Sequence, residues 1–155
     1  MLTYKSATLD QVDELFRLME ADSSEYLQES LKTMQMTRDQ FAHLFRTVGE
    51  VYAIYQDDEL AGFYWIEERG NILHLHGLIL KPSFQGRGIG TQVLQMLVDR
   101  YQGKMDHVEL GVHQSNERAR KLYLRLGYEV VDFRSDVGYY IMRKSLAARP
   151  ASPGA

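Results

Sequence analysis

The sequence of 155 residues contains no cysteine, three prolines and one tryptophan. Without cysteine the chain can form no disulfide, no thiolate zinc site and no cysteine nucleophile. It also lacks a strong excess of either charge, because 18 lysines and arginines oppose 21 aspartates and glutamates for a net charge of −3. A chain without a basic field attracts nucleic acid poorly, so we expect no nucleic-acid partner.

Long apolar runs and ligand motifs are absent as well. No run approaches the ~18 residues that a membrane span needs. The first five residues also lack the charged-then-apolar layout of a signal peptide. We therefore expect no membrane association and a cytoplasmic location. The five histidines are scattered rather than arranged as His-Glu-x-x-His, so no metal site is expected.

The composition of the sequence, with 45% hydrophobic and 25% charged residues, is typical of soluble globular domains. The length suits one compact domain with a sizeable core. We expect a single domain over residues 1–146. The last stretch, residues 147–155, is rich in proline and small residues and is expected to be a disordered tail.

Two helices are indicated early in the chain by capping boxes. Thr8 with Gln11, and Thr37 with Gln40, have the spacing in which two side chains satisfy amides at a helix start. Apolar residues three and four apart follow each box, so each helix has one apolar face. The polar stretch between them, residues 22–36, is interpreted as a further helix that flanks a site.

From residue 50 the pattern changes to that of strands and then of alternating strands and helices. Three consecutive strand-like runs predict an antiparallel meander. The predicted strands are 3–7, 51–55, 60–66, 72–80, 107–112, 128–133 and 139–143, and the predicted later helices are 88–101 and 117–126. This order predicts a mixed α/β (α+β) fold, in which a mostly antiparallel central sheet is flanked by helices.

The most informative stretch is the loop between the strand ending at Leu80 and the next helix. Its glycines at 86, 88 and 90 let backbone amides converge, and a helix N-terminus carries roughly half a positive charge. This strand–loop–helix context predicts a phosphate site, with Arg87 adding a contact at its rim. The glycine spacing differs from the P-loop and from the dinucleotide fingerprint. The alternative is a flexible glycine turn that simply begins a helix.

Two motifs resemble the GNAT superfamily of N-acetyltransferases. Residues 85–90, Gln-Gly-Arg-Gly-Ile-Gly, are similar to the family's coenzyme loop. Residues 116–129 resemble its second signature, Asn-x-x-Ala-x-x-Leu-Tyr-x-x-x-Gly-Phe/Tyr-Glu, and residues 139–144 resemble its last strand more loosely. The resemblance runs from about residue 52 to residue 144. It implies the GNAT fold and an acyltransferase that uses acetyl-CoA.

The resemblance also implies residues that bind the coenzyme. The strand before the loop would offer backbone groups to the pantetheine arm, and the loop amides would hold the pyrophosphate. The amide of Leu78 would in addition stabilise the oxyanion. The implied coenzyme-binding residues are Leu78, Ile79, Leu80, Gln85, Gly86, Arg87, Gly88, Ile89, Gly90, Thr91 and Asn116.

Tyr123 occupies the position of the family's general acid, which protonates the departing CoA thiolate. A phenol of pKa ~10 can donate a proton to a thiolate whose thiol has a pKa of ~8.5. The alternative is a tyrosine that only packs at the seam between helix and sheet.

The general base is not implied by the resemblance, because some relatives place a glutamate where this chain has Gly111. His74 and His76 alternate along one strand and share a face, and an unperturbed histidine has a pKa of ~6.5. We predict His76 as the base, since it lies nearer to Leu78. The alternatives are a water relay, histidines that only face solvent, or one of the neighbours that share the parity of Gly111, namely His107, Glu109 and His113.

The implied reaction is direct attack of a primary amine on acetyl-CoA in a ternary complex, with no covalent acyl-enzyme. The acceptor would be a small-molecule or peptide amine, and its pocket would come from residues 20–50 and 134–139. Two alternatives stay open, namely a non-catalytic acyl-CoA-binding regulatory module and transfer of a longer acyl group. A homodimer through an edge strand is also compatible with the pattern.

Overall fold

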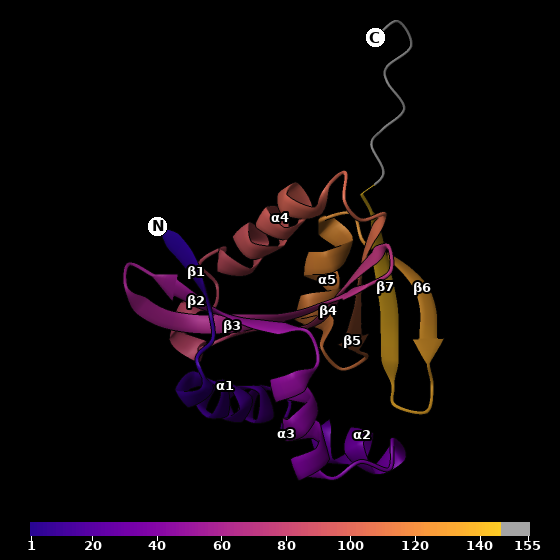
Figure 1. Ribbon diagram of the computed structural model, residues 1–155. Helices are drawn as coiled ribbons and strands as arrows, with labels where there is room; N and C mark the ends of the chain where they lie inside the picture. Colours follow the sequence, from indigo (N-terminus) through magenta and orange to yellow (C-terminus); the bar gives the residue numbers. More distant parts are fainter. Residues whose placement is uncertain (147–155) are drawn as a thin grey trace, which may run out of the picture.

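Seven strands form one sheet in the computed structural model, which describes residues 1–146 (Figure 1). The predicted tail at 147–155 lies outside the described residues. The strands are β1 (Leu2–Ser6), β2 (Glu50–Gln56), β3 (Glu59–Arg69), β4 (Ile72–Leu80), β5 (His107–His113), β6 (Glu129–Arg134) and β7 (Tyr139–Ser145). The helices are α1 (Leu9–Asp22), α2 (Leu27–Thr33), α3 (Arg38–Thr47), α4 (Ile89–Tyr101) and α5 (Glu117–Arg125), with a 3₁₀ turn at Pro82–Phe84.

The spatial order of the sheet is β1-β2-β3-β4-β5-β7-β6, and β4 with β5 is its one parallel pair. This confirms the mixed, mostly antiparallel sheet expected from the sequence. Both capping boxes are formed, Thr8 with Gln11 at α1 and Thr37 with Gln40 at α3. Within residues 1–146, no helix is long and apolar enough to cross a membrane.

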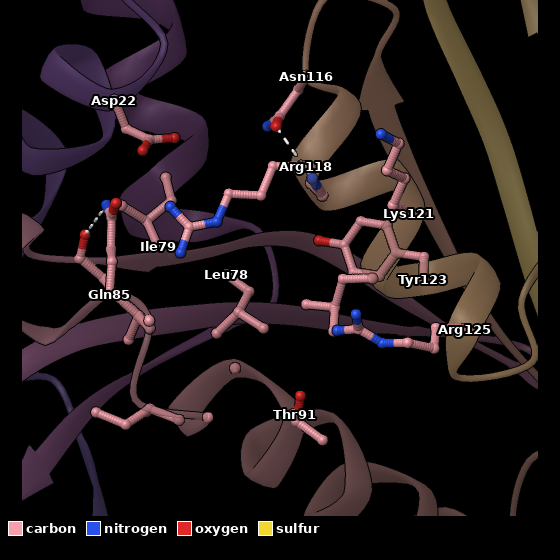
Figure 2. A pocket seen from close by; sticks show the side chains of 17 residues that line it. Asp22, Leu78, Ile79, Gln85, Thr91, Asn116, Arg118, Lys121, Tyr123 and Arg125 are labelled. Atoms are coloured by element: carbon pink, nitrogen blue, oxygen red, sulfur yellow. Dashed lines mark hydrogen bonds between the residues drawn. The ribbon is translucent and has the colours of Figure 1, made fainter.

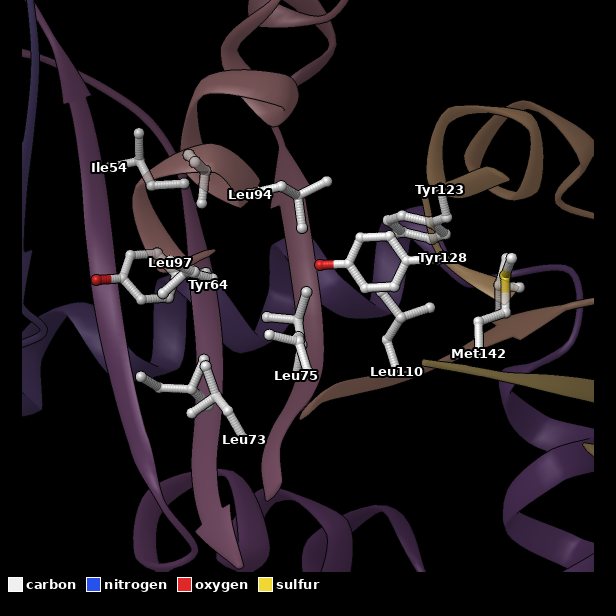
Figure 3. Packing of buried hydrophobic residues seen from close by; sticks show 14 of the residues in the cluster. Ile54, Tyr64, Leu73, Leu75, Leu94, Leu97, Leu110, Tyr123, Tyr128 and Met142 are labelled. Carbon is white, nitrogen blue, oxygen red and sulfur yellow. The ribbon is translucent and has the colours of Figure 1, made fainter. Parts of the chain in front are cut away.

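Helices cover both faces of the sheet (Figure 1). One apolar cluster lies between the sheet and α4 and α5, with Leu94 and Leu97 of α4 against Leu73 and Leu75 of β4 (Figure 3). A second cluster lies on the opposite face, where α1 and α3 pack against β2 and β3. Burying each large apolar side chain contributes roughly 1.5–3 kcal/mol. The sheet is therefore fixed from both sides, and its local distortions are held in place.

The distortion that matters for function is in β4. A β-bulge makes Trp65 pair with Gly77 and Ile66 pair with Leu75, which leaves His76 as the extra residue. Leu75 and Ile79 are four residues apart and would share a face in a regular strand. Here Leu75 belongs to the α4 and α5 cluster and Ile79 to the α1 and α3 cluster, so the bulge switches the faces of the strand. The pairing of β4 with β5 also ends at Leu75. Beyond this residue the sheet opens.

Candidate active site

Two cavities meet where β4 and β5 separate. The larger, of about 560 Å³, lies between β4, the loop at 85–91 and α5 (Figure 2). The smaller, of about 140 Å³, lies among β4, β5, β7 and the segment from α1 to α3. After the ligands that the family resemblance implies, we call them the coenzyme cavity and the acceptor cavity. The residues that line both are Asp22, Leu78, Ile79, Asn116, Ala119 and Tyr123.

The glycine loop leaves the start of α4 open. Gly88 is the N-cap of α4 with φ of 78°, a left-handed conformation that favours glycine, and no side chain caps the helix. The first amides of the helix, at residues 89–91, therefore have no partner within it. The α1 and α3 helices are capped by threonine side chains, so α4 differs from them. An uncapped helix N-terminus that opens on a cavity suits an anion such as phosphate.

Two glycine variants distinguish the need for a left-handed backbone at Gly88 from the need for space at Gly90. We expect Gly88→Ala to destabilise the fold by about 1 kcal/mol, because alanine must adopt a left-handed conformation. Its acetyl-CoA Kd should rise about tenfold as the amides shift. A Cβ on Gly90 meets only Leu122 Cδ2, at 3.8 Å. Gly90→Ala should therefore keep the fold and stabilise it by up to about 1 kcal/mol. Thermal unfolding and calorimetric titration of both variants check this, and equal losses would contradict it.

The edge of β4 that faces the opening offers backbone groups. The Lys81 N–H donates to the Ala61 carbonyl at 2.7 Å. By the alternation of an antiparallel ladder, Ile79 turns its amide and carbonyl toward β3, whereas Leu78 and Leu80 turn theirs away. Gln85 Nε2 donates to the Leu80 carbonyl at 3.1 Å and so braces the loop against the strand. Of the three strand residues predicted for the coenzyme, Leu78 and Leu80 have the suitable backbone direction.

The side chains of Arg87 and Asn116 make contacts other than the coenzyme contacts that the sequence analysis expected of them. The Arg87 guanidinium lies 5.0 Å from the Phe84 ring centroid, and its Nη1 donates to Gln56 Oε1 at 3.2 Å. The Arg87 side chain is thus absent from the lining of the coenzyme cavity. Asn116 does line both cavities, but its Oδ1 accepts from the Ala119 N–H at 3.2 Å and caps α5.

Cations of α5, which the sequence analysis did not single out, line the coenzyme cavity instead. They are Arg118, Lys121 and Arg125. Their spacing of three and four residues places them on one helix face, and Figure 2 shows them reaching toward the cavity from α5. This spacing is visible in the sequence and could have been read there. The positive charge at this site thus comes from α5 rather than from Arg87.

Tyr123 stands at the junction of the two cavities. Its side chain comes from α5, and Figure 2 shows the hydroxyl directed toward the space between α5 and β4. The residue is 9% exposed, and its hydroxyl has no hydrogen-bond partner among the described residues. Burial raises the pKa of Tyr123 to about 12, so the hydroxyl stays protonated at neutral pH.

His76 lies on the acceptor side of this junction. It lines the acceptor cavity, its ring stacks on Trp65 at 4.4 Å, and its Nε2 lies 2.8 Å from Glu67 Oε1. Burial lowers the pKa of His76, which favours the neutral ring at pH 7. In the neutral tautomer that donates Nε2–H to Glu67, the other nitrogen, Nδ1, carries a free lone pair. This arrangement suits a proton acceptor.

His74, the other predicted candidate, is placed differently. Its Nδ1 lies 3.2 Å from Glu109 Oε1, and Glu109 also accepts from Arg143 Nε at 2.7 Å. Burial lowers the pKa of His74 to about 4. Neither His74 nor Glu109 lines the acceptor cavity, whereas His113 does and stacks on Tyr26 at 4.1 Å.

Gly111 marks the place where some relatives have a glutamate. A Cβ on Gly111 would lie 3.5 Å from Tyr139 Cδ2. This is an ordinary van der Waals distance, so the Tyr139 ring lies beside Gly111, which is itself exposed, without blocking a Cβ there. Among residues 1–146 there is also no group of three or more side chains that could hold a metal ion.

Comparison with known proteins gives a match to one protein family and to curated relatives. A profile of the acetyltransferase (GNAT) family matches residues 12–128. The chain is 27% identical over 139 residues to a mycothiol acetyltransferase of Propionibacterium freudenreichii, covering 84% of this chain and 43% of that protein. The chain spans less than half the length of the curated relatives that it matches.

Solved structures share the fold at low sequence identity. The PaiA N-acetyltransferase of Thermoplasma acidophilum, determined in complex with coenzyme A, has a TM-score of 0.71 and 19% identity, covering 94% of this chain and 99% of that one. The ribosomal-protein-S18-alanine N-acetyltransferase of Escherichia coli has a TM-score of 0.70 and 18% identity, covering 99% of both chains. At such identities the likeness establishes the fold alone.

Proposed function

The chain belongs to the GNAT family of acetyltransferases, and from this premise we propose that it transfers an acetyl group from acetyl-CoA to a primary amine. The observation that carries the proposal is the joining of two cavities at Tyr123. One side has an uncapped helix start and three cations, which suit phosphates, and the other has a neutral histidine. This division suits a reaction between an anionic thioester and an amine.

On the coenzyme side, acetyl-CoA is a substrate whose phosphates would accept from the amides at residues 85–91. The α5 cations would contribute charge-assisted contacts. The amides of Leu78 and Leu80 would bind the pantetheine arm, and the Leu78 amide would then donate to the oxyanion of the tetrahedral intermediate. Relatives solved with coenzyme A or acetyl-CoA bound support this choice of co-substrate.

On the acceptor side, an amine of pKa ~10.4 is mostly ammonium at pH 7, which costs about 4.6 kcal/mol unless the site removes a proton. His76 would take that proton at Nδ1, with Glu67 holding the opposite nitrogen. The amine nitrogen then attacks the thioester carbonyl, the carbon–sulfur bond breaks, and the Tyr123 hydroxyl protonates the thiolate. The nitrogen loses a second proton as the amide forms, and this proton restores the Tyr123 hydroxyl. The overall reaction passes through a ternary complex and releases the one proton that His76 has taken.

Selective binding of the co-substrate tests the first half of the proposal. Acetyl-CoA at 100 times its Kd should stabilise the fold by ~2.7 kcal/mol, which raises Tm by several degrees. ATP and NAD are the controls, since both carry a pyrophosphate. Equal shifts with all three compounds would mean that the loop binds phosphates without selecting coenzyme A. A shift with acetyl-CoA and no thiol release with any amine would indicate a non-catalytic binding module.

The pH dependence of turnover tests the base. At a constant concentration of one amine acceptor, we expect the wild-type rate to fall as the pH drops through the pKa of His76, because the protonated ring cannot accept a proton. This pKa is lowered from the ordinary value of about 6.5. His76→Ala should lower the rate at pH 7.5 by about 100-fold and move the acid limb up toward the pKa of the amine itself, because only amine that is already neutral can then attack.

His74→Ala is the matched control, since it removes the neighbouring ring that does not line the cavity. It should keep the wild-type pH profile. If His76→Ala also keeps that profile, a water relay replaces His76 as the base.

A further inference from the structure

The two joined cavities differ in charge. The coenzyme cavity is lined by three cations of α5, whereas no lysine or arginine is among the described residues that line the acceptor cavity. Burial lowers the pKa of both histidines of the acceptor cavity, His76 and His113, which favours their neutral form at pH 7. The single carboxylate of that lining is Asp22.

Asp22 is the last residue of α1 and lines both cavities at their junction. Its carboxylate makes no hydrogen bond or ion pair with any residue from 1 to 146. Arg118, the cation whose side chain crosses the coenzyme cavity, has its guanidinium beside Gly86 of the loop, 3.7 Å from where a Cβ would stand. Asp22 is exposed, and it lines both cavities. Partial desolvation raises the pKa of its carboxyl, and no charged neighbour lowers that pKa. A cationic ligand in the cavities would be a partner of opposite charge.

The walls beside Asp22 are aromatic and close together. Tyr26 stacks on His113 at 4.1 Å, and Tyr139 meets both rings edge-on at 5.9 and 5.2 Å. A volume of about 140 Å³ holds only a few water-sized groups, since each water occupies about 30 Å³. The cavity therefore fits an amine with a small neighbouring group. A carboxylate next to that amine would lie near Asp22 and would find no cation among the described residues that line the acceptor cavity.

We propose that Asp22 binds the acceptor as a primary ammonium, and that this acceptor carries an uncharged group, an amide or a hydrocarbon, next to its amine. Free amino acids, in which a carboxylate adjoins the amine, are then excluded. This inference rests on the proposed acetyl transfer and deepens it by naming the class of acceptor. Two sources have this chemistry, a small amine and the N-terminus of a peptide.

The test compares acceptors that differ only in the carboxylate. Thiol release from acetyl-CoA is measured with L-alaninamide and with L-alanine, and amidated trialanine serves as the peptide arm. We expect kcat/KM for L-alaninamide to exceed that for L-alanine by about 100-fold or more, because two carboxylates repel at short range. A kcat/KM for trialanine amide at or above that of L-alaninamide identifies a peptide N-terminus as the source, and a much lower value identifies a small amine.

Asp22→Asn keeps the shape of the side chain and removes its charge. It should raise the KM for L-alaninamide by about 10–100-fold, reduce the preference over L-alanine to less than about tenfold, and leave the KM for acetyl-CoA within about twofold. Asp58→Asn, in the exposed turn between β2 and β3, is the control and should change none of these values. Asp22→Ala is a second variant, and circular dichroism checks that both are folded.

A readout without turnover completes the design. Saturation-transfer NMR of L-alaninamide with the CoA-loaded protein should give a signal that Asp22→Asn loses. Equal kcat/KM for L-alanine and L-alaninamide, or an unchanged KM in Asp22→Asn, would overturn the role of Asp22 and leave acetyl transfer intact. Bound acetyl-CoA with no acetylation of any acceptor would instead overturn the proposed function, and this inference with it.

Discussion

Replacement of Tyr123 by phenylalanine is expected to lower kcat by about 10²–10⁴-fold, the range over which a general acid contributes. The variant loses only the hydroxyl that stands at the junction of the two cavities. Its ring still packs beside Tyr128, with centroids 5.7 Å apart, so the fold should keep its stability. The Kd for acetyl-CoA should stay within about twofold, because the hydroxyl acts only when sulfur becomes an anion.

Tyr128→Phe is the matched control for this variant. The Tyr128 hydroxyl is buried and has no hydrogen-bond partner within residues 1–146, so its removal should leave kcat unchanged and cost no stability. Steady-state rates by thiol release and Kd values by calorimetry check both variants. Unchanged turnover in Tyr123→Phe would remove the residue from the chemistry. A parallel loss of fold or of coenzyme binding would assign it a packing role.

Removal of the cationic face of α5 is expected to have the next largest effect. The triple variant Arg118→Gln, Lys121→Gln and Arg125→Gln should raise the Kd for acetyl-CoA by about 100-fold, at about 1 kcal/mol for each phosphate contact. The affinity of the wild type should also weaken with added salt, because these side chains are exposed, and the triple variant should lose most of this dependence. Calorimetric titration at two salt concentrations measures both effects.

Arg120→Gln is the control on the same helix. The Arg120 guanidinium lies over the Tyr140 ring at 5.1 Å and does not line the coenzyme cavity. Its loss should change the acetyl-CoA Kd by less than about twofold. If Arg120→Gln weakens binding as much as one of the cavity-lining substitutions, the effect comes from the overall charge of α5 and the cationic face has no special role.

The sequence predicted the elements of this fold well where local chemistry determines them. β4 has the predicted bounds of 72–80, and both capping boxes form. β3 extends three residues beyond its predicted end, because Glu67, Glu68 and Arg69 continue to pair with β4. That extension depends on a partner strand, which the periodicity of one segment cannot reveal. It also brings Glu67 to His76.

The candidate site was predicted in part. The glycine loop, Tyr123 and His76 all meet around the two cavities, because motif spacing and strand alternation are local properties. The direction of the Arg87 side chain depends on Gln56, which lies 31 residues away, and motif spacing does not contain this information. The bulge at His76 and the exposure of Asp22 to both cavities likewise arise from the packing of separate elements.

Transfer of the acetyl group from acetyl-CoA to an amine is tested most directly by following both products of one turnover. Protein loaded with acetyl-CoA is mixed with L-alaninamide, and free thiol and N-acetyl-alaninamide are measured over time. The chain itself has no cysteine, so every thiol detected comes from the coenzyme. We expect equal amounts of both products, formed at a rate that depends on the concentration of the amine. Thiol release at the same rate without amine, or no acetylated product with amide or peptide acceptors, would contradict it.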